Sequence, residues 1–234
     1  MPSVSAVLLD VGGVFLLPSP EVMLPPLHAA GVRPCVTDLE RAHYKATAAV
    51  ESFPEPGRWA RYLRAYALAC GVPEDRAEAA AADLDREIQD FSREVQGFTW
   101  GHIAPGSADG LREIAALGLP IAIVSNSTGT VEQQLADLGI CQTGPGKGTE
   151  VGAVIDSAVV GMEKPDPRIF ALALERLGIG RDGVVHVGDT VRFDIDGAHA
   201  AGIRPVHLDP YGDCPAPDGH EHIRRLGDLL PIIR

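Results

Sequence analysis

The chain has 234 residues, and its 32 acidic and 20 basic side chains give it a formal net charge of −12. Hydrophobic residues make up 45% and charged residues 22%, which is the composition of a globular protein with one large domain or two small ones. The acidic balance argues against a nucleic-acid partner, because that binding needs Lys and Arg to neutralise phosphates, and against an anionic membrane surface.

The sequence also bears on the location of the protein. No apolar run approaches the ~20 residues of a membrane span. Residues 1–10 contain no Lys or Arg and therefore lack the basic region that opens a secretory signal peptide. We expect a cytoplasmic protein without a membrane partner. Its scattered cysteines form no C-x-x-C pair, which favours reduced thiols over a zinc or redox motif.

An apolar strand at residues 4–9 precedes a long helical segment. Thr37 and Glu40 have the spacing of a capping box, which predicts that a helix begins there. A second helix is predicted over residues 58–69, before a glycine. A third begins at Pro73, and its apolar residues recur at helical spacing.

After Trp100 the pattern changes to alternating strands and helices. The predicted strands are 120–125, 151–156, 183–187 and 204–208, and the predicted helices are 107–117, 130–138, 166–177 and 194–201. This alternation indicates an α/β fold with a parallel sheet covered on both faces. Residues 1–17 and 103–234 are therefore predicted to form the α/β domain, with 18–102 as an all-helical insertion. The Gly-rich stretch 143–152 is predicted to be a mobile surface loop.

Polar side chains follow several of these strands, and ligands of open α/β sheets bind at the carboxyl ends of the strands. Carboxylates hold Mg²⁺, a lysine helps to neutralise a phosphoryl group, and a carboxylate attacks phosphorus to give an aspartyl-phosphate. The candidates in this sequence are Asp10, Ser125, Asn126, Lys164, Asp189 and Asp194.

Four segments resemble the motifs of the haloacid dehalogenase-like (HAD) hydrolases, in order and at the spacing of that family. They are LLDVGGV, IVSNST, GMEKPDPRIF and HVGDTVRFDIDGAHAAG. The resemblance covers nearly the whole chain. It implies a Rossmann-like parallel-sheet core with an α-helical cap inserted between motifs one and two.

The resemblance also implies roles for individual residues. Asp10 resembles the nucleophile, and Ser125 resembles the hydroxyl that hydrogen-bonds the transferred group. Lys164 resembles the lysine that balances the charge on nucleophile and phosphoryl group. Asn126, beside that hydroxyl, offers a backbone N–H to the phosphate.

The implied Mg²⁺ ligands are Asp10, the backbone carbonyl of Gly12, Asp189 and Asp194, the last directly or through water. At Gly12 the sequence departs from the family, because phosphatases usually carry there a second Asp that protonates the leaving oxygen and then activates water. Losing a general acid/base typically costs ~10²–10⁴ in rate.

Three explanations for Gly12 stay open. The leaving group needs little protonation, as in an anomeric sugar phosphate or an acyl phosphate; or a cap residue supplies the proton, with His28, His43 and Tyr44 as candidates; or the protein is a weak enzyme or none. Asp194 has a structural alternative as a helix cap.

We expect a Mg²⁺-dependent phosphatase of a small phosphorylated metabolite. The alternative is a catalytically impaired member that binds a metal and a phosphate ligand, or a protein partner. A 2-haloacid dehalogenase is a third possibility, disfavoured by the retained Gly188-Asp189 pair. The histidines form no recognisable metal-ligand pattern, and His220 and His222 are predicted to be solvated in a C-terminal loop. The oligomeric state stays open.

Overall fold

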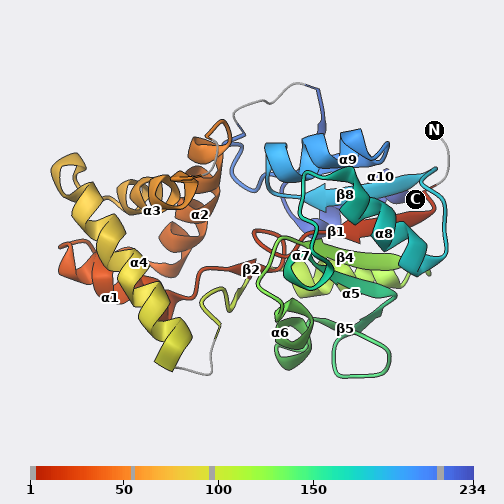
Figure 1. The fold of residues 1–234 in the computed structure, drawn as a ribbon, viewed down its shortest axis with the longest axis horizontal. Helices are drawn as coiled ribbons and strands as arrows, with labels where there is room; N and C mark the ends of the chain where they lie inside the picture. Colours follow the sequence, from red (N-terminus) through yellow and green to blue (C-terminus); the bar gives the residue numbers. More distant parts are fainter. Residues whose placement is uncertain (1–3, 54–55, 95–97, 215–218) are drawn as a thin grey trace. The chain divides into compact units, whose positions relative to one another are not determined.

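The computed structural model describes residues 4–53, 56–94, 98–214 and 219–234, and Figure 1 shows its fold. The chain divides into two compact units. We call them the core unit and the helical unit. The core unit comprises Met1–Phe15, Ile103–Gly212 and Ala216–Arg234, and the helical unit comprises Leu16–His102 and Asp213–Pro215.

The core unit is built on a six-stranded sheet in the order β10-β9-β8-β1-β4-β7. Its strands are β1 (Ala6–Leu9), β4 (Ile121–Ser125), β7 (Ala153–Asp156), β8 (Val184–Gly188), β9 (Arg204–Leu208) and β10 (Glu221–Ile223). All neighbouring strands run parallel, and in the centre Leu8 pairs with Ala122 on one side and with His186 on the other. The α/β fold predicted from strand–helix alternation is therefore confirmed.

The central strands of the sheet are buried along their whole length because helices cover the sheet (Figure 1). On one face, α8 (Pro167–Leu177) and α9 (Asp196–Ala200) pack Phe170 and Ala198 into the apolar cluster. The other helices of the core unit are α5 (Ser107–Ala115), α6 (Val131–Asp137), α7 (Ser157–Val160) and α10 (Leu230–Ile233), with short turns η2 (Val191–Ile195) and η3 (Leu226–Leu229).

Helix α8 illustrates how local sequence sets the boundaries of an element. The side chain of Asp166 accepts a hydrogen bond from the backbone N–H of Arg168 at 2.9 Å, and Pro167 occupies the first helical position. Gly178 ends the helix in the left-handed conformation, with φ 67°. Lys164 therefore lies three residues before the start of α8, whose first turn is set by this cap.

The helical unit contains α1 (Pro20–Ala29), α2 (Val36–Val50), α3 (Arg58–Ala69) and α4 (Ala77–Glu94), with a short 3₁₀ turn η1 (Glu74–Arg76). Leu39, Leu63 and Tyr66 lie in its buried core. The predicted capping box at Thr37 is wrong. Helix α2 is instead capped by Cys35, whose backbone N–H donates to the Asp38 carboxylate at 2.8 Å, because that carboxylate occupies the third helical position.

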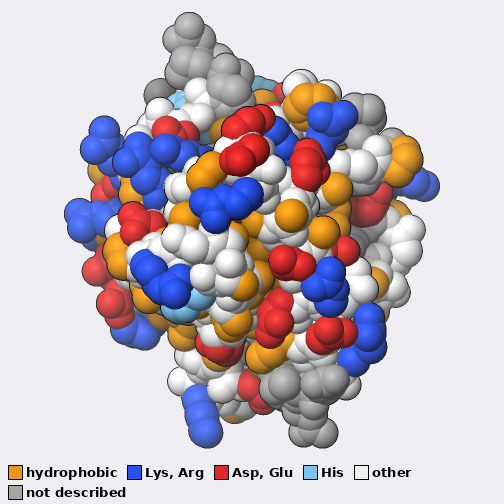
Figure 2. Space-filling view, turned by 90° about the vertical axis from the view of Figure 1, so that its left-hand side faces the viewer, with side chains coloured by type: hydrophobic (Ala, Val, Ile, Leu, Met, Phe, Trp, Pro, Cys, Tyr) orange, Lys and Arg blue, Asp and Glu red, His pale blue; other side chains and the backbone are white. Residues whose placement is uncertain are grey.

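One face of the molecule is drawn in Figure 2. Basic and acidic side chains are interspersed on it, with hydrophobic side chains between them. In the helical unit Arg64 pairs with Glu74 and also with Glu78, the latter at 2.8 Å. Exposed pairs of this kind contribute little to stability.

The Gly-rich stretch 143–152 is a loop only over residues 144–148, whereas the sequence predicts a loop throughout. Strands β5 (Cys141–Thr143) and β6 (Thr149–Val151) flank this loop and form a two-stranded parallel sheet. The side chain of Gln142 accepts from the backbone N–H of Gly148 at 2.8 Å and donates to two backbone carbonyls, so the side chain fixes the turn. A further two-stranded sheet joins β2 (Leu16–Leu17) and β3 (His102–Ile103).

Candidate active site

The polar residues chosen from the sequence gather at the carboxyl edge of the core sheet. Asp10 directly follows β1, Ser125 is the last residue of β4, and Asp189 directly follows β8. These three strands are neighbours, and the backbone N–H of Asp10 donates to Val187 in β8 at 2.9 Å. Parallel strands thus bring residues that are far apart in the sequence to one edge.

Lys164 lies between two carboxylates of this group. Its Nζ is 2.7 Å from Oδ1 of Asp10 and 2.6 Å from Oδ1 of Asp194. The lysine is 1% exposed and Asp194 is 0% exposed. A buried charge without partners is very costly, so the lysine and the carboxylates depend on one another for their stability in this position.

Asp194 is held by more than the lysine. Its carboxylate accepts hydrogen bonds from Nε2 of His186 at 2.9 Å and from the backbone N–H of Thr190 at 3.1 Å, and also from the Thr190 hydroxyl. It lies in η2, a short π-helical turn. The side chain does not cap α9, and it belongs to the buried polar cluster. His186, which sequence analysis did not select, is the additional member.

Asp10, Asp189 and Asp194 each present one carboxylate oxygen, and these oxygens lie within 4.8 Å of one another. All three residues are buried. Counting Lys164, the cluster holds more negative than positive formal charges. Oxygen ligands with excess negative charge are the donor set that a hard divalent cation prefers.

The pKa values of Asp10 and Asp194 are shifted in opposite directions. Burial, together with the nearby carboxylates of Asp194 and Asp189, raises the pKa of Asp10 to about 7 against the opposing effect of Lys164. Burial acts in the same way on Asp194, but Lys164 and His186 outweigh it and hold the pKa of this carboxyl well below its usual range. Burial also lowers the pKa of His186. The pKa of Lys164 is raised because its two carboxylate partners outweigh burial.

Two glycines permit the close packing of these acids. A Cβ at Gly13, where φ is 67°, would lie 2.2 Å from a carboxylate oxygen of Asp189. A Cβ at Gly188 would lie 2.1 Å from Cγ of Asp194. Gly12 is different, because a Cβ there meets nothing within 4 Å. Packing therefore does not explain why Gly12 lacks a side chain.

The side chain of Asn126 has a structural contact that the sequence did not predict. Its Oδ1 accepts from the backbone N–H of Lys164 at 2.8 Å, and its Nδ2 donates to the carbonyl of Lys164 at 3.0 Å. This double hydrogen bond ties the end of β4 to the segment that carries the lysine. Ser125, one residue earlier, is 3% exposed.

The three residues that the sequence suggests as alternative proton donors all lie in the helical unit. His43 and Tyr44 are buried in α2, and Nδ1 of His43 is 2.8 Å from the hydroxyl of Tyr62. His28 is exposed on α1.

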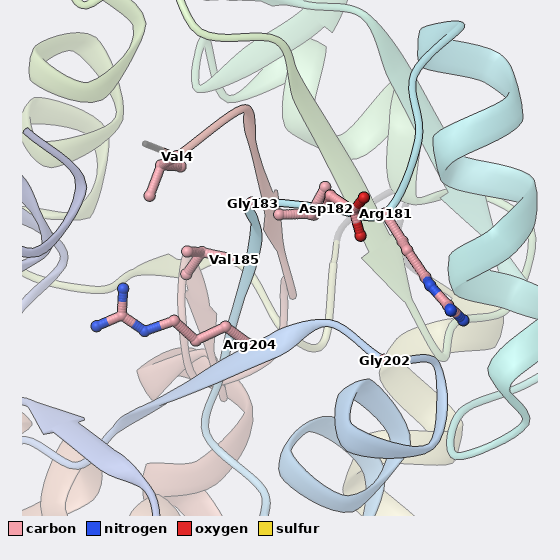
Figure 3. A pocket seen from close by; sticks show the side chains of 8 residues that line it. Val4, Arg181, Asp182, Gly183, Val185, Gly202 and Arg204 are labelled. Atoms are coloured by element: carbon pink, nitrogen blue, oxygen red, sulfur yellow. The ribbon is translucent and has the colours of Figure 1, made fainter. Parts of the chain in front are cut away.

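A hollow of 480 Å³ opens at the other end of the core sheet (Figure 3). It is lined by residues that precede or begin β1, β8 and β9, including Val4, Arg181 and Arg204. None of the carboxylates described above lines it. The hollow is therefore separate from the carboxyl edge of the sheet.

Comparisons with known proteins agree with this architecture. A model of the family described as haloacid dehalogenase-like hydrolase matches residues 4–202. The human haloacid dehalogenase-like hydrolase domain-containing protein 3 is 32% identical over 163 residues, which cover 67% of this chain and 60% of that protein. Its mouse counterpart is 35% identical over 60% of this chain and 51% of that protein. The chain thus spans little more than half the length of these relatives.

Two further matches extend the comparison. The phosphoserine phosphatase of Thermus thermophilus is 29% identical over 185 residues, which cover 79% of this chain and 67% of that protein. The solved structure of the HAD-hydrolase YfnB from Bacillus subtilis, described as bound to magnesium, matches with a TM-score of 0.61 at 16% identity over 99% of each chain. At this identity the second match shows a shared fold. In the described part of the chain, no helix is both long and apolar enough to span a membrane.

Proposed function

Because the chain belongs to the haloacid dehalogenase-like hydrolase family, we propose that it is a phosphatase of a small phosphorylated metabolite with Asp10 as the nucleophile. The observation that carries this proposal is the buried cluster in which Lys164 contacts Asp10 and Asp194. Phosphatases of phosphoserine and of ribulose-1,5-bisphosphate among the relatives support the same class of substrate.

The three clustered carboxylates suit Mg²⁺, and we propose Asp10, Asp189, Asp194 and the backbone carbonyl of Gly12 as the residues that hold it. When bound, Mg²⁺ neutralises charge on the phosphoryl group as a Lewis acid. The excess negative charge of the cluster and its oxygen-only donors support this assignment.

In the proposed reaction, a carboxylate oxygen of Asp10 attacks phosphorus, and the bond from phosphorus to the leaving oxygen breaks. Water then attacks the phosphorus of the aspartyl-phosphate, which releases inorganic phosphate and restores the carboxylate. Lys164 keeps the carboxylate of Asp10 oriented by its ion pair and balances the charge that develops on the phosphoryl oxygens. Ser125 and the backbone N–H of Asn126 bind the transferred group.

Gly12 limits the substrates that this site handles well. The chain has no carboxylate two residues after the nucleophile, so proton donation to the leaving oxygen is weak from this position. We propose that the preferred substrates have good leaving groups, as anomeric sugar phosphates and acyl phosphates do. The helical insertion predicted from the sequence, residues 18–102, is proposed to act as a cap that shields the site from bulk water.

The test is phosphate release from a panel of monoesters, anomeric sugar phosphates and acyl phosphates, with Mg²⁺ and with a chelator. We expect turnover that needs both Mg²⁺ and Asp10, and that is lost in Asp10→Asn. Asp182→Asn, an exposed carboxylate of the same unit, is the matched control. Turnover that persists in purified Asp10→Asn contradicts the proposal. Halide release without Mg²⁺ supports a dehalogenase instead, and no turnover with retained Mg²⁺ binding supports an impaired, ligand-binding protein.

A further inference from the structure

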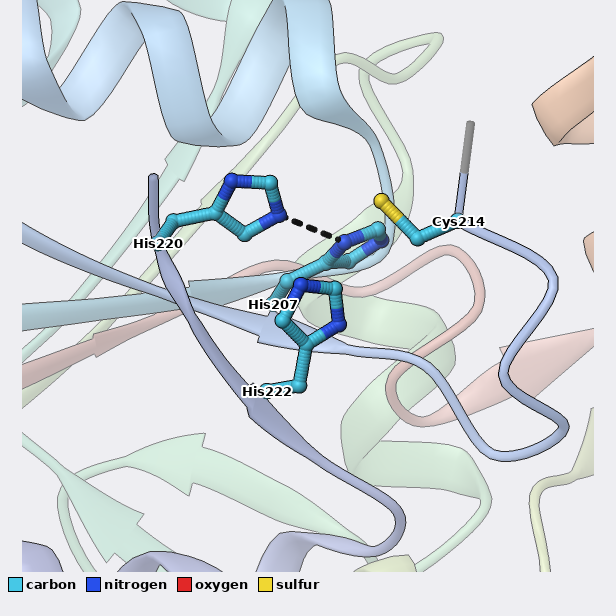
Figure 4. Close-up of side chains that lie close together, drawn as sticks. All are labelled: His207, Cys214, His220 and His222. Carbon is cyan, nitrogen blue, oxygen red and sulfur yellow. Dashed lines mark hydrogen bonds between the residues drawn. The ribbon is translucent and has the colours of Figure 1, made fainter. Parts of the chain in front are cut away.

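Three histidines of the core unit gather near the end of β9 and the start of β10 (Figure 4). His207 in β9 and His222 in β10 are direct partners in the parallel register. His220 lies two residues before His222, in the bend that precedes β10, and its ring stacks on that of His222. Strand pairing and this stacking bring the three rings together. The sequence analysis did not predict this cluster. His222 lies in β10 and not in a loop, but its side chain is exposed as predicted, and His220 is half-buried in the bend before β10.

The distances between the rings suit a transition metal. Nδ1 of His207 is 3.1 Å from Nε2 of His220, and one ring nitrogen from each histidine lies within 4.8 Å of the others. With zinc–nitrogen bonds near 2.0–2.1 Å, two ligands of a tetrahedral site are about 3.3 Å apart. The rings of His220 and His222 are 4.5 Å apart between centroids, and each is about as close to His207, at 5.2 and 5.1 Å.

The hydrogen bonds of His207 leave its Nδ1 without a proton, as a metal ligand requires. Its Nε2 donates to the backbone carbonyl of Asp189 at 3.0 Å, because that oxygen only accepts. In the neutral ring Nδ1 then carries the lone pair, and Nδ1 is the atom that faces His220. Metal-binding histidines commonly have their second nitrogen fixed in this way. Nδ1 of His222 is 3.5 Å from the carboxylate of Asp209, which is a longer contact than that of His207.

The chemistry of the three side chains determines which metal they would bind. Three nitrogen donors select borderline cations such as Zn²⁺ and are poor ligands for Mg²⁺.

We propose that His207, His220 and His222 form a Zn²⁺ site that is distinct from the carboxylate cluster. The site takes one ring nitrogen from each of the three histidines. Because His207 also holds the carbonyl of Asp189, the zinc site adjoins the edge of the sheet where the acids lie. The proposal does not depend on the phosphatase activity.

The experiment uses the full chain, stripped with a chelator and kept in excess Mg²⁺. Zn²⁺ is titrated against a chromophoric zinc indicator, and Co²⁺ is added separately to record its visible absorption. We expect one tightly bound Zn²⁺ per chain and the intense Co²⁺ bands of a tetrahedral site. His220→Ala and His222→Ala, shown to be folded by circular dichroism, are each expected to weaken Zn²⁺ binding by at least about 100-fold.

Two control variants make the result specific. His199→Ala removes an exposed histidine of the same unit that is not in the cluster, and it is expected to retain zinc. Asp10→Asn alters the carboxylate cluster and is also expected to retain it. The proposal is overturned if the wild-type chain takes up no zinc, if either cluster variant binds zinc as tightly as His199→Ala, or if Asp10→Asn is the variant that loses it.

Discussion

The ionised carboxylate of Asp10 is expected to destabilise the folded protein in the absence of metal. Its pKa is raised from 3.8 to about 7, first by burial and then by its acidic neighbours. A tenfold change in an acid dissociation constant corresponds to about 1.4 kcal/mol, so ionisation of Asp10 costs the folded state on the order of 4 kcal/mol. Asp10→Asn removes this cost. It also removes the ion pair between Asp10 and Lys164, and this loss destabilises the variant by about 1–3 kcal/mol.

The pH dependence separates these two effects. Because the pKa of Asp10 is raised on folding, its contribution to stability is fully present below 3.8 and is lost as the pH rises to about 7. The asparagine variant lacks this loss. In urea unfolding with a chelator, the stability of Asp10→Asn relative to wild type is therefore expected to increase by roughly 3 kcal/mol between about pH 5 and pH 8.

Mg²⁺ supplies the control for this experiment. A cation that binds only the folded state stabilises it by about 2.7 kcal/mol at a concentration 100 times its dissociation constant. We expect wild type to gain more from Mg²⁺ than Asp10→Asn does, because the variant has one carboxylate fewer. A stability difference that does not change with pH, or an equal Mg²⁺ effect in both proteins, would refute the reasoning.

Three further predictions concern neighbouring residues. A Cβ at Gly12 meets no atom within 4 Å, so Gly12→Asp is expected to fold normally and to hydrolyse substrates with poor leaving groups about 10²-fold or more faster in a phosphate-release assay; an unchanged rate contradicts the role of Gly12. Asn126→Ala breaks both hydrogen bonds to the Lys164 backbone and is expected to cost about 1–3 kcal/mol in urea unfolding, whereas a loss below about 0.5 kcal/mol shows that the contact is dispensable. Burial lowers the pKa of His186, so the neutral ring stabilises the folded protein above about pH 6.5. As the pH falls below this value, the free energy of unfolding decreases by up to about 1.4 kcal/mol for each tenfold rise in proton concentration. His186→Gln is therefore expected to lose less stability than wild type between about pH 7.5 and 5.5, and equal losses disprove this assignment.

The sequence by itself determined five of the six strands of the core sheet and the helices α5, α6, α8 and α9, because their signals are local. The apolar run that ends at Asp10, the cap at Asp166 and the Gly after α8 each depend on residues within one turn or strand. Alternation of such elements was enough to predict a parallel sheet. Local signals failed where two candidates lay close together, as at the start of α2, where Cys35 is the N-cap and its backbone N–H donates to the Asp38 carboxylate.

Contacts between strands were decided only by the tertiary structure. His186 contacts Asp194 from its buried position in β8, where it pairs with Leu8 of β1. This strand pairing joins residues that are far apart in the sequence. The three-histidine cluster likewise requires the register in which His222 pairs with His207. Sequence spacing carries no information about such a register, because it is set by how the whole sheet buries its apolar faces.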